Sequence, residues 1–310
     1  MIFKNIAVVG SNGFIGSHLA RKLLQIEGAQ IALFGKNEVS VLGREVNYNK
    51  IDLTNKAQLR HFFSGIDVVY YLATESIPFS TWDNPVAEVE KNLIPFLGFM
   101  EVMAECKVKK VVFTSSAGTI YGTTDQKATE ESFKNPFSPH GIVKLTMEYF
   151  LNYFKVKYNL DFDVYRIANC YGPGQQTKKG LGIINTFLEK IIEERRINIF
   201  GDGKAIRNYI YAEDLAELMT HSLYAPQGKC EIYNAASHEH LSINDIVAVM
   251  KRIIDEEFEV VYTEKRQSDN PAIYLDNKKI VTDCPQLQFT GIEEGILKTY
   301  KHIKALQPVV

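Results

Sequence analysis

The sequence has few of the residues that mark secreted or metal-binding proteins. Its 310 residues contain four cysteines and a single tryptophan. The cysteines, at positions 106, 170, 230 and 284, form no C-x-x-C pair, and no histidine lies at metal-ligand spacing from them. Disulfides belong to oxidising compartments, so we expect reduced thiols, a cytoplasmic location and no metal site.

An excess of charge of one sign is also missing. The 35 basic and 37 acidic residues nearly cancel, and neither sign forms a long run. The sequence therefore lacks the clustered positive charge that is typical of nucleic-acid-binding proteins. No segment is apolar for long enough to cross a bilayer, and the N-terminal "MIFKNIAVVG" lacks the pattern of a signal peptide. We therefore expect no nucleic-acid partner and no membrane partner.

What the first half of the chain does have is an alternation of short β-branched runs with amphipathic stretches. This rhythm is typical of βαβ units in a parallel sheet. Strands are predicted at 6–10, 30–35, 68–73, 110–116 and 163–169, and helices at 15–25, 56–63, 85–105 and 140–157. The predicted fold class is α/β, a doubly wound parallel (Rossmann) sheet followed by a smaller C-terminal domain.

The alternation becomes irregular after "NCYGPG" (169–174). We place a domain boundary there, with a dinucleotide-binding domain over 1–170 and a second region over 171–310. Residues 205–236 are expected to return to the first domain, with "CEIYNAAS" (230–237) as a late strand of its sheet.

The motif "GSNGFIG" follows the first predicted strand and opens the first predicted helix. Glycines in such a turn let the backbone approach a pyrophosphate, whose charge the helix N-terminus favours. The alternative is a tight turn that only packs helix against sheet. On the first interpretation the cofactor contacts are Gly10, Gly13, Phe14, Ile15 and Gly16.

The second predicted strand ends in Gly35, Lys36 and Asn37, where dinucleotide folds usually carry a carboxylate for the adenosine ribose. Without that carboxylate a 2′-phosphate meets no repulsion, and Lys36, with Arg44, offers it a positive charge. The sequence therefore favours NADP, with NAD possible. The alternative is that Lys36 is an ordinary surface lysine.

Two further segments carry polar side chains of catalytic type. "FTSSAGTIYG" (113–122) places Ser115, Ser116 and Thr119 at the carboxyl end of a strand, where open parallel sheets bind ligands. Serines at strand ends also cap turns without further function. "SPHGIVK" (138–144) places His140 one helical turn before Lys144.

These segments, with "NCYGPG" and "GDGKAIRNYIYAEDLAE" (201–217), occur in the order found in the extended short-chain dehydrogenase/reductase family. The chain resembles its branch of NAD(P)-dependent nucleotide-sugar epimerases, dehydratases and 4-ketoreductases over nearly its whole length. The resemblance implies a nucleotide-diphosphate sugar as substrate, bound by the region 171–310, and a homodimer.

The resemblance also implies roles for individual positions. Lys144 would bind the nicotinamide ribose and lower the pKa of the acid-base group. Further cofactor contacts would be Asp52, Leu53, Ala73 and Asn92. The sugar nucleotide would be bound by Asn169, Arg207, Arg266 and Asp269. Arg207 suits its role physically, because a guanidinium fork matches a diphosphate.

The chain departs from the family pattern at two catalytic positions. The usual Ser/Thr position falls on Ala117, so its work passes to Thr119 or Ser116. The catalytic tyrosine position is His140. An imidazole, with an ordinary pKa near 6.5, can perform the same proton transfer, although its tip ends about 2 Å short of a tyrosine hydroxyl. Tyr121 is a second source of a phenol.

Two functions follow from this pattern. One is an active nucleotide-sugar epimerase or 4-ketoreductase that uses His140, Lys144, Thr119 and Ser116. A dehydratase is disfavoured, because Gly118 and Thr119 replace that group's acidic pair. The other is a cofactor-binding protein with little or no catalysis, either a sensor or a degraded enzyme.

Overall fold

The computed structural model describes residues 3–76, 82–123, 126–177, 182–264 and 272–307. The chain divides into two compact units, each built from several segments. Unit 1 comprises 1–120, 135–166 and 216–233, and unit 2 comprises 121–134, 167–215 and 234–310. Each unit is described by itself.

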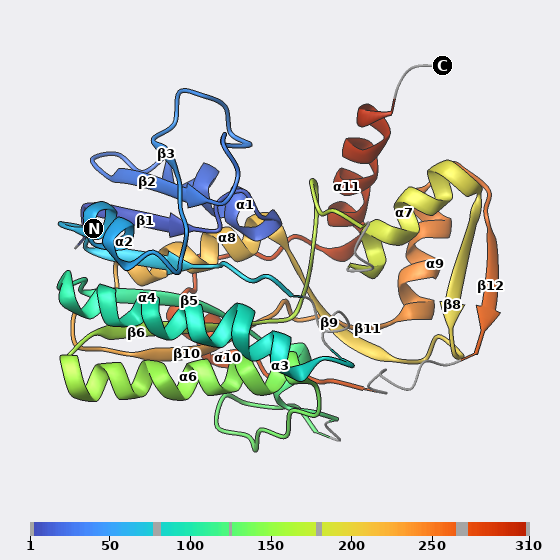
Figure 1. The fold of residues 1–310 in the computed structure, drawn as a ribbon. Helices are drawn as coiled ribbons and strands as arrows, with labels where there is room; N and C mark the ends of the chain where they lie inside the picture. The colour runs from blue at the N-terminus through green and yellow to red at the C-terminus, as the bar shows by residue number, and fades with distance from the viewer. Residues whose placement is uncertain (1–2, 77–81, 124–125, 178–181, 265–271, 308–310) are drawn as a thin grey trace. The chain divides into compact units, whose positions relative to one another are not determined.

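Unit 1 is organised around a seven-stranded sheet with the order β10-β6-β5-β4-β1-β2-β3 (Figure 1). The pairs β1–β2, β1–β4, β2–β3 and β4–β5 are parallel. The strands are β1 (Asn5–Val9), β2 (Gln30–Gly35), β3 (Tyr48–Lys50), β4 (Val68–Tyr71), β5 (Lys110–Ser116), β6 (Asp161–Ile167) and β10 (Glu231–Ala235). This is the doubly wound Rossmann order, so the predicted fold class is confirmed.

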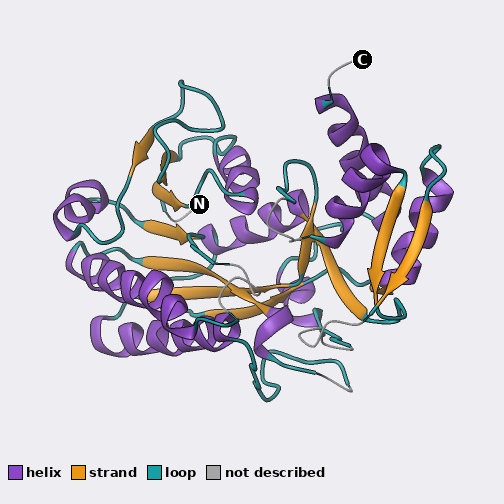
Figure 2. Cartoon of the chain, turned by 45° about the vertical axis from the view of Figure 1, so that its right-hand side comes forward, coloured by secondary structure: helices purple, strands orange, loops and turns teal. Residues whose placement is uncertain are grey.

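Helices cover both faces of this sheet. Successive side chains of a strand point to opposite faces, so each strand contributes side chains to both layers of the core. On one face Ala7, Val69 and Val111 pack against α2 (Lys56–Phe63), α4 (Ile94–Glu105) and α6 (Pro139–Tyr158). On the other face Tyr70 donates a hydrogen bond to a carbonyl of α8 (Ala212–Thr220), and α1 (Phe14–Leu23) follows β1. Figure 2 shows these helices surrounding the strands.

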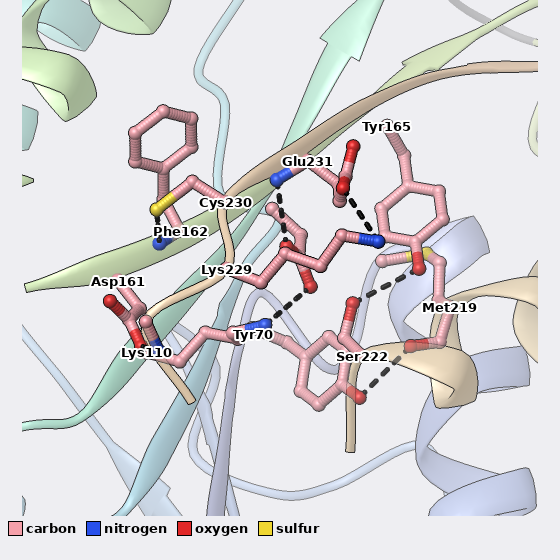
Figure 3. Close-up of polar contacts among 12 residues, drawn as sticks. Tyr70, Lys110, Asp161, Phe162, Tyr165, Met219, Ser222, Lys229, Cys230 and Glu231 are labelled. Atoms are coloured by element: carbon pink, nitrogen blue, oxygen red, sulfur yellow. Dashed lines mark hydrogen bonds and ion pairs between the residues drawn. The ribbon is translucent and has the colours of Figure 1, made fainter. Parts of the chain in front are cut away.

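A buried ion pair joins three neighbouring strands at one end of the sheet (Figure 3). The Lys110 ammonium of β5 lies 2.9 Å from the Asp163 carboxylate of β6, and both side chains are almost fully buried. Asp163 also accepts a hydrogen bond from the backbone N–H of Glu231 in β10. A buried pair of this kind adds little net stability, because the cost of desolvating both charges offsets most of their attraction.

Unit 2 contains two small sheets and three long helices. β7 (Asn169–Tyr171), β9 (Ile206–Tyr211) and β11 (His240–Ser242) form one sheet, and β8 (Arg196–Phe200) and β12 (Glu259–Thr263) form the other. A separate apolar core joins α7 (Ile183–Glu194), α9 (Ile243–Ile253) and α11 (Ile292–Leu306). The remaining helices of the described chain are short: α3 (Pro85–Glu88), η1 (Val89–Leu93), α5 (Ala117–Ile120), η2 (His221–Leu223) and α10 (Lys278–Asp283).

The segment 205–236 returns to the first sheet only in part. β10 is its seventh strand, as predicted for 230–237. β9, however, pairs with β7 and β11, so residues 206–211 belong to unit 2 and that part of the prediction is wrong. The physical reason is that "IRNYIY" has the composition of any half-buried strand, and pairing partners far along the chain decide its sheet.

Candidate active site

The glycine turn after β1 is shaped by contacts that only glycine allows. Gly10 has a left-handed φ of +89°, and a Cβ added to Gly16 would lie 2.1 Å from the Gly10 carbonyl oxygen. Gly13, the N-cap of α1, offers no side chain to the first turn of that helix. Backbone N–H groups at this helix N-terminus therefore suit a phosphate group, and the residues present fit a dinucleotide pyrophosphate.

The turn lies at the switch point of the sheet. β1 lies between β2 and β4, so the chain runs outward in opposite directions on its two sides. In open α/β sheets ligands bind at this point. A Cβ at Gly10 would lie 3.0 Å from the backbone nitrogen of Ala73, which follows β4. The structure thus brings together Gly10 and Ala73, and half-buried Phe14 and Ile15 begin α1.

The end of β2 is crowded by Tyr48. A Cβ at Gly35 would lie 2.7 Å from the Tyr48 hydroxyl, so a side chain there would require Tyr48 to shift. Lys36 is exposed, and its ammonium lies 2.7 Å from the Glu75 carboxylate. It is therefore an ion-paired surface lysine whose charge is partly compensated by Glu75. Arg44 is exposed on the loop before β3.

The remaining predicted adenine-side residues follow β3. The Asp52 carboxylate accepts hydrogen bonds from the backbone and hydroxyl of Thr54, which lower its pKa. Leu53 is half-buried against the core of unit 1. Asp52 and Leu53 both lie in the turn between β3 and α2, at the carboxyl edge of the sheet.

Helix α6 carries two of the predicted catalytic side chains, His140 and Lys144, on one face. Ser138 caps its N-terminus by accepting a hydrogen bond from the Gly141 N–H, and Pro139 occupies the first turn, where its missing N–H costs nothing. His140 and Lys144 are four residues apart, so both project from the same side, and both are buried.

Gly141 allows this helix to approach the polar end of β5. A Cβ at Gly141 would lie 2.5 Å from the carbonyl oxygen of Thr119 in α5. Lys144 donates from Nζ to the carbonyl of Thr114 at 2.9 Å, and its ammonium lies 4.7 Å from the centre of the Phe113 ring. Burial lowers the pKa of Lys144 to about 8. Among the described residues no carboxylate forms an ion pair with Lys144, although the charges of Glu88 and Glu148 act on it from a distance.

Hydroxyl groups line the same edge. Ser115 Oγ is buried and has no hydrogen-bond partner among the described residues, which leaves a donor free for a ligand. Ser116 and Thr119 are half-buried, and Thr119 Oγ1 lies 3.5 Å from the Ser116 carbonyl. Ala117 is fully buried and offers no hydroxyl. The structure therefore brings Ser115, Ser116 and Thr119 to the end of β5.

The surroundings of His140 include a residue that sequence reasoning missed. The Glu88 carboxylate, itself only 1% exposed, lies 3.3 Å from His140 Nδ1. The pKa of His140 is lowered, mainly by burial and also by the Lys144 charge, against the opposing effect of Glu88. The imidazole is therefore neutral at pH 7 and able to accept a proton.

Asn92 holds the loop after β4 rather than pointing to open space. Its carbonyl oxygen accepts from the Glu75 N–H and the Thr74 hydroxyl, and its amide donates to Ser76 and Glu88. It lies in the π-helical segment η1, and such segments are frequent at functional sites. Its position supports a role in shaping the site.

The predicted sugar-nucleotide residues lie in unit 2 or outside the described chain. Asn169 starts β7 and donates to the Asn208 carbonyl, and Arg207 is half-buried on β9. Arg266 and Asp269 lie outside the described residues. Tyr121 donates to Asn234 at 2.7 Å and is buried within unit 2, so its phenol is already engaged.

The described residues contain neither a metal-binding cluster nor a membrane-spanning helix. No group of three His, Cys, Asp or Glu side chains there is arranged to hold a metal ion. Among the helices described, none has the length and apolar character needed to cross a membrane.

Comparisons with known proteins agree on one protein family. The profile of the NAD dependent epimerase/dehydratase family matches residues 6–236. A putative UDP-glucose 4-epimerase of Methanocaldococcus jannaschii is 30% identical over 280 residues, which are 88% of this chain and 90% of the relative. An Escherichia coli dTDP-4-dehydro-6-deoxyglucose reductase is 26% identical, over 96% of this chain and 97% of its own.

Solved structures agree with these relatives. UDP-glucose 4-epimerase of Thermotoga maritima, crystallised with UDP-glucose, has a TM-score of 0.90 at 26% identity and covers 97% of this chain and 99% of its own. The Thermus thermophilus UDP-glucose 4-epimerase in complex with NAD has a TM-score of 0.89 at 25% identity, with 98% and 100% covered. Both support the doubly wound fold described above.

Proposed function

Because the chain belongs to the NAD dependent epimerase/dehydratase family, we propose that it epimerises a nucleotide-diphosphate sugar at a ring carbon, with His140 as the acid-base group. The observation that carries this proposal is the placement of a buried, neutral imidazole one turn from Lys144, on a helix that approaches Thr119 at Gly141. This cluster lies in the same unit as the glycine turn after β1. Relatives named as 4-epimerases favour C4 as the reacting carbon.

The chemistry divides between the cofactor and the side chains. A bound nicotinamide dinucleotide supplies the hydride acceptor and donor. His140 accepts the proton of the sugar hydroxyl as its carbon is oxidised and returns it when the carbonyl is reduced on the other face. Thr119 or Ser116 donates a hydrogen bond to the same sugar oxygen. Lys144 holds a ribose hydroxyl, and its charge disfavours protonation of His140.

A net 4-ketoreductase is the second candidate. The residues that move the proton are the same, and a relative named as a dTDP-4-dehydro-6-deoxyglucose reductase covers nearly the whole chain. The two candidates differ in whether the cofactor is regenerated within the cycle or consumed. A product assay with UDP-sugars and a 340-nm assay with 4-keto sugar nucleotides separate them.

Replacement of His140 tests the central claim. We expect His140→Ala to lower kcat at least 100-fold, because a positioned acid-base group contributes about 10²- to 10⁴-fold. The assay separates the two sugar epimers by chromatography after incubation with the wild type. His61→Ala, an exposed histidine of α2, is the matched control and is expected to keep full activity. Activity in His140→Tyr with none in the wild type would instead identify a degraded site.

For the cofactor we propose NADP in preference to NAD, with NAD still accepted. The support is the absence of a carboxylate at Gly35 and the positive charge of Lys36 beside it. The Glu75 ion pair competes for that charge, so Glu75→Gln is expected to tighten NADP binding about two- to fivefold, within the range of exposed ion pairs, and to leave NAD unchanged. Calorimetric titration measures both constants. Tighter binding of NAD to both proteins would reverse the preference.

The sugar nucleotide is proposed to contact Asn169 and Arg207 of unit 2, together with Arg266 and Asp269. The guanidinium of Arg207 suits a diphosphate, and it lies on β9 beside the buried Tyr209. We also propose a homodimer, which the exposed apolar side chains of α6 and its neighbours support.

A further inference from the structure

Glu88 is a buried carboxylate beside His140 to which no role has been assigned above. We propose that Glu88 is a positioning residue, which holds the His140 imidazole with its proton on Nδ1 and so presents Nε2 as the proton-accepting nitrogen. The identity of the substrate, but not the state of the imidazole, rests on the function proposed above.

The environment of Glu88 is built to hold a carboxylate. An unpaired charge away from water is costly, so a buried carboxylate needs donors. One oxygen, Oε1, receives three of them: the Ser76 hydroxyl at 2.8 Å, the Asn92 amide at 3.1 Å and His140 Nδ1 at 3.3 Å. They come from the loop after β4, from η1 and from α6. The carboxylate is therefore the point where three segments meet.

The protons in this cluster can be assigned by counting donors. Ser76 has one hydroxyl proton, and it is directed to Glu88. The Ser76 oxygen also lies 3.4 Å from His140 Nδ1, and toward that nitrogen it can only accept. Both neighbours of Nδ1 are thus acceptors, so the proton of the neutral imidazole belongs on Nδ1. Distances of 3.3 and 3.4 Å are typical of catalytic contacts that tighten when substrate binds.

The other ring nitrogen is left available. Among the described residues none forms a hydrogen bond with His140 Nε2, whereas both contacts described above are to Nδ1. With the proton on Nδ1, Nε2 carries the lone pair. The partner on Nδ1 decides which nitrogen reacts, as in other histidine sites oriented by a carboxylate.

The charged groups facing His140 explain why a carboxylate is useful here. Burial and the Lys144 ammonium both lower the pKa of the imidazole, and Glu88 raises it. Lys144 lies on α6 itself and Glu88 on α3, while the neighbouring side chains Ser76 and Asn92 are uncharged. Without Glu88 the imidazole would be a weaker base, and it would also lose the group that orients it.

The first test is spectroscopic and needs no turnover. Nitrogen-15 shifts of the ring distinguish the two tautomers, and the His140→Ala spectrum assigns the signals. We expect the neutral ring of the wild type to carry its proton on Nδ1, and we expect Glu88→Gln to lower the pKa of His140. A neutral ring with its proton on Nε2 would overturn the proposal. An inactive wild type with the expected tautomer would count against the proposed function alone.

The second test separates positioning from simple support of the fold. We expect Glu88→Ala to lower kcat on the order of 100-fold in the wild type, since misplacement by about 1 Å has that effect. The same substitution in the His140→Tyr background is expected to change kcat less than about threefold, because the imidazole is no longer there to be oriented. An equal loss in both backgrounds would show that Glu88 is only structural.

Two controls complete the kinetic test. Glu90→Ala removes an exposed carboxylate two residues along the same helical stretch and is expected to leave kcat unchanged. In Glu88→Gln, which keeps an acceptor oxygen, the acidic limb of the kcat profile should move to lower pH, since the imidazolium has lost its counter-charge. An unmoved limb would contradict the coupling of Glu88 to His140.

Discussion

Burial lowers the pKa of two side chains in the first turns of α6, the His140 imidazole and the Lys144 ammonium, with different consequences. His140 stays neutral at pH 7 because its pKa is lowered, and it is thereby a base. Lys144, whose pKa falls to about 8, stays mostly protonated at pH 7 although its charge is poorly solvated. Burial of the Lys144 charge therefore lowers the free energy of unfolding of the protein without ligand. A hydrogen bond to a cofactor hydroxyl would offset only part of this loss.

That cost predicts that Lys144→Met stabilises the protein. A fall from 10.5 to about 8 corresponds to roughly 3 kcal/mol against the folded state, from which the lost hydrogen bond to Thr114 subtracts about 1 kcal/mol. We expect the free energy of unfolding to rise by about 1–2 kcal/mol at pH 7, with kcat reduced at least 100-fold. Urea denaturation followed by circular dichroism gives the comparison.

The pH dependence of this difference has a definite sign. Between pH 8 and 10.5 Lys144 is protonated in the unfolded chain but not in the folded chain. The free energy of unfolding of the wild type therefore rises with pH relative to that of the variant. The advantage of the variant should be full below pH 8, shrink as pH rises, and reverse by about 1 kcal/mol near pH 10.5, where only the lost hydrogen bond to Thr114 remains. A variant less stable than the wild type at pH 7, or a difference independent of pH, would contradict this account. Exposed Lys301→Met of α11 serves as the control.

Single residues could be predicted from the sequence where they belong to a recognisable motif. The tight turn at Gly10 and Gly16 was predicted from their spacing after a strand, and the positive φ of Gly10 and the close approach of Gly16 to its carbonyl give the physical reason. Glu88 could not be found in this way. It is one of two acidic residues in "VAEVEKN", and only the tertiary contacts with Ser76 and His140 distinguish it from exposed Glu90.

At the scale of elements, strands flanked by clear turns were predicted well. β2, β5 and α2 have the predicted limits, because apolar runs with sharp glycine or polar ends define them. The helix predicted over 85–105 is present but contains the π-helical segment η1. Five residues are too few for hydrophobic periodicity to predict such a segment.

Elements of unit 2 were harder to predict from sequence. β7, β11 and β12 are three to five residues long and only partly buried, so neither length nor alternation marks them. A local signal did exist for α9, whose capping box joins Ser242 and Asp245. Local capping chemistry is readable in sequence, whereas the pairing of short strands depends on distant segments.

At the scale of the whole molecule, the fold class was predictable and the path of the chain between the units was not. The chain passes from one unit to the other after residues 120, 134, 166, 215 and 233. The sequence predicts a single boundary near 170. The passages after 120, 215 and 233 fall within or at the end of α5, α8 and β10, where no change of composition marks them.

The proposed homodimer is argued from one surface of unit 1. Four large apolar side chains of α6 are exposed along one stripe: Ile142, Tyr149, Tyr153 and Val156, the last at 80%. The helices α3 and α4 pack against α6, and that stretch exposes Val86, Val89 and Ile94 (Figure 1). Exposed apolar side chains gathered on packed helices in this way suit a second copy related by a two-fold axis.

Charge placed on this stripe is expected to separate the subunits. Val156→Asp combined with Tyr149→Asp would bury two carboxylates per subunit at the interface, each repelled by its symmetry mate, at a cost of several kcal/mol. Sedimentation velocity should show a dimer of about 70 kDa for the wild type, twice the 35.2 kDa chain, and a monomer for the variant. Leu306→Asp, an equally exposed apolar residue of α11 in unit 2, should remain dimeric. A wild type that sediments as a monomer at micromolar concentration would overturn the proposal, and a dimeric double variant would move the interface away from α6.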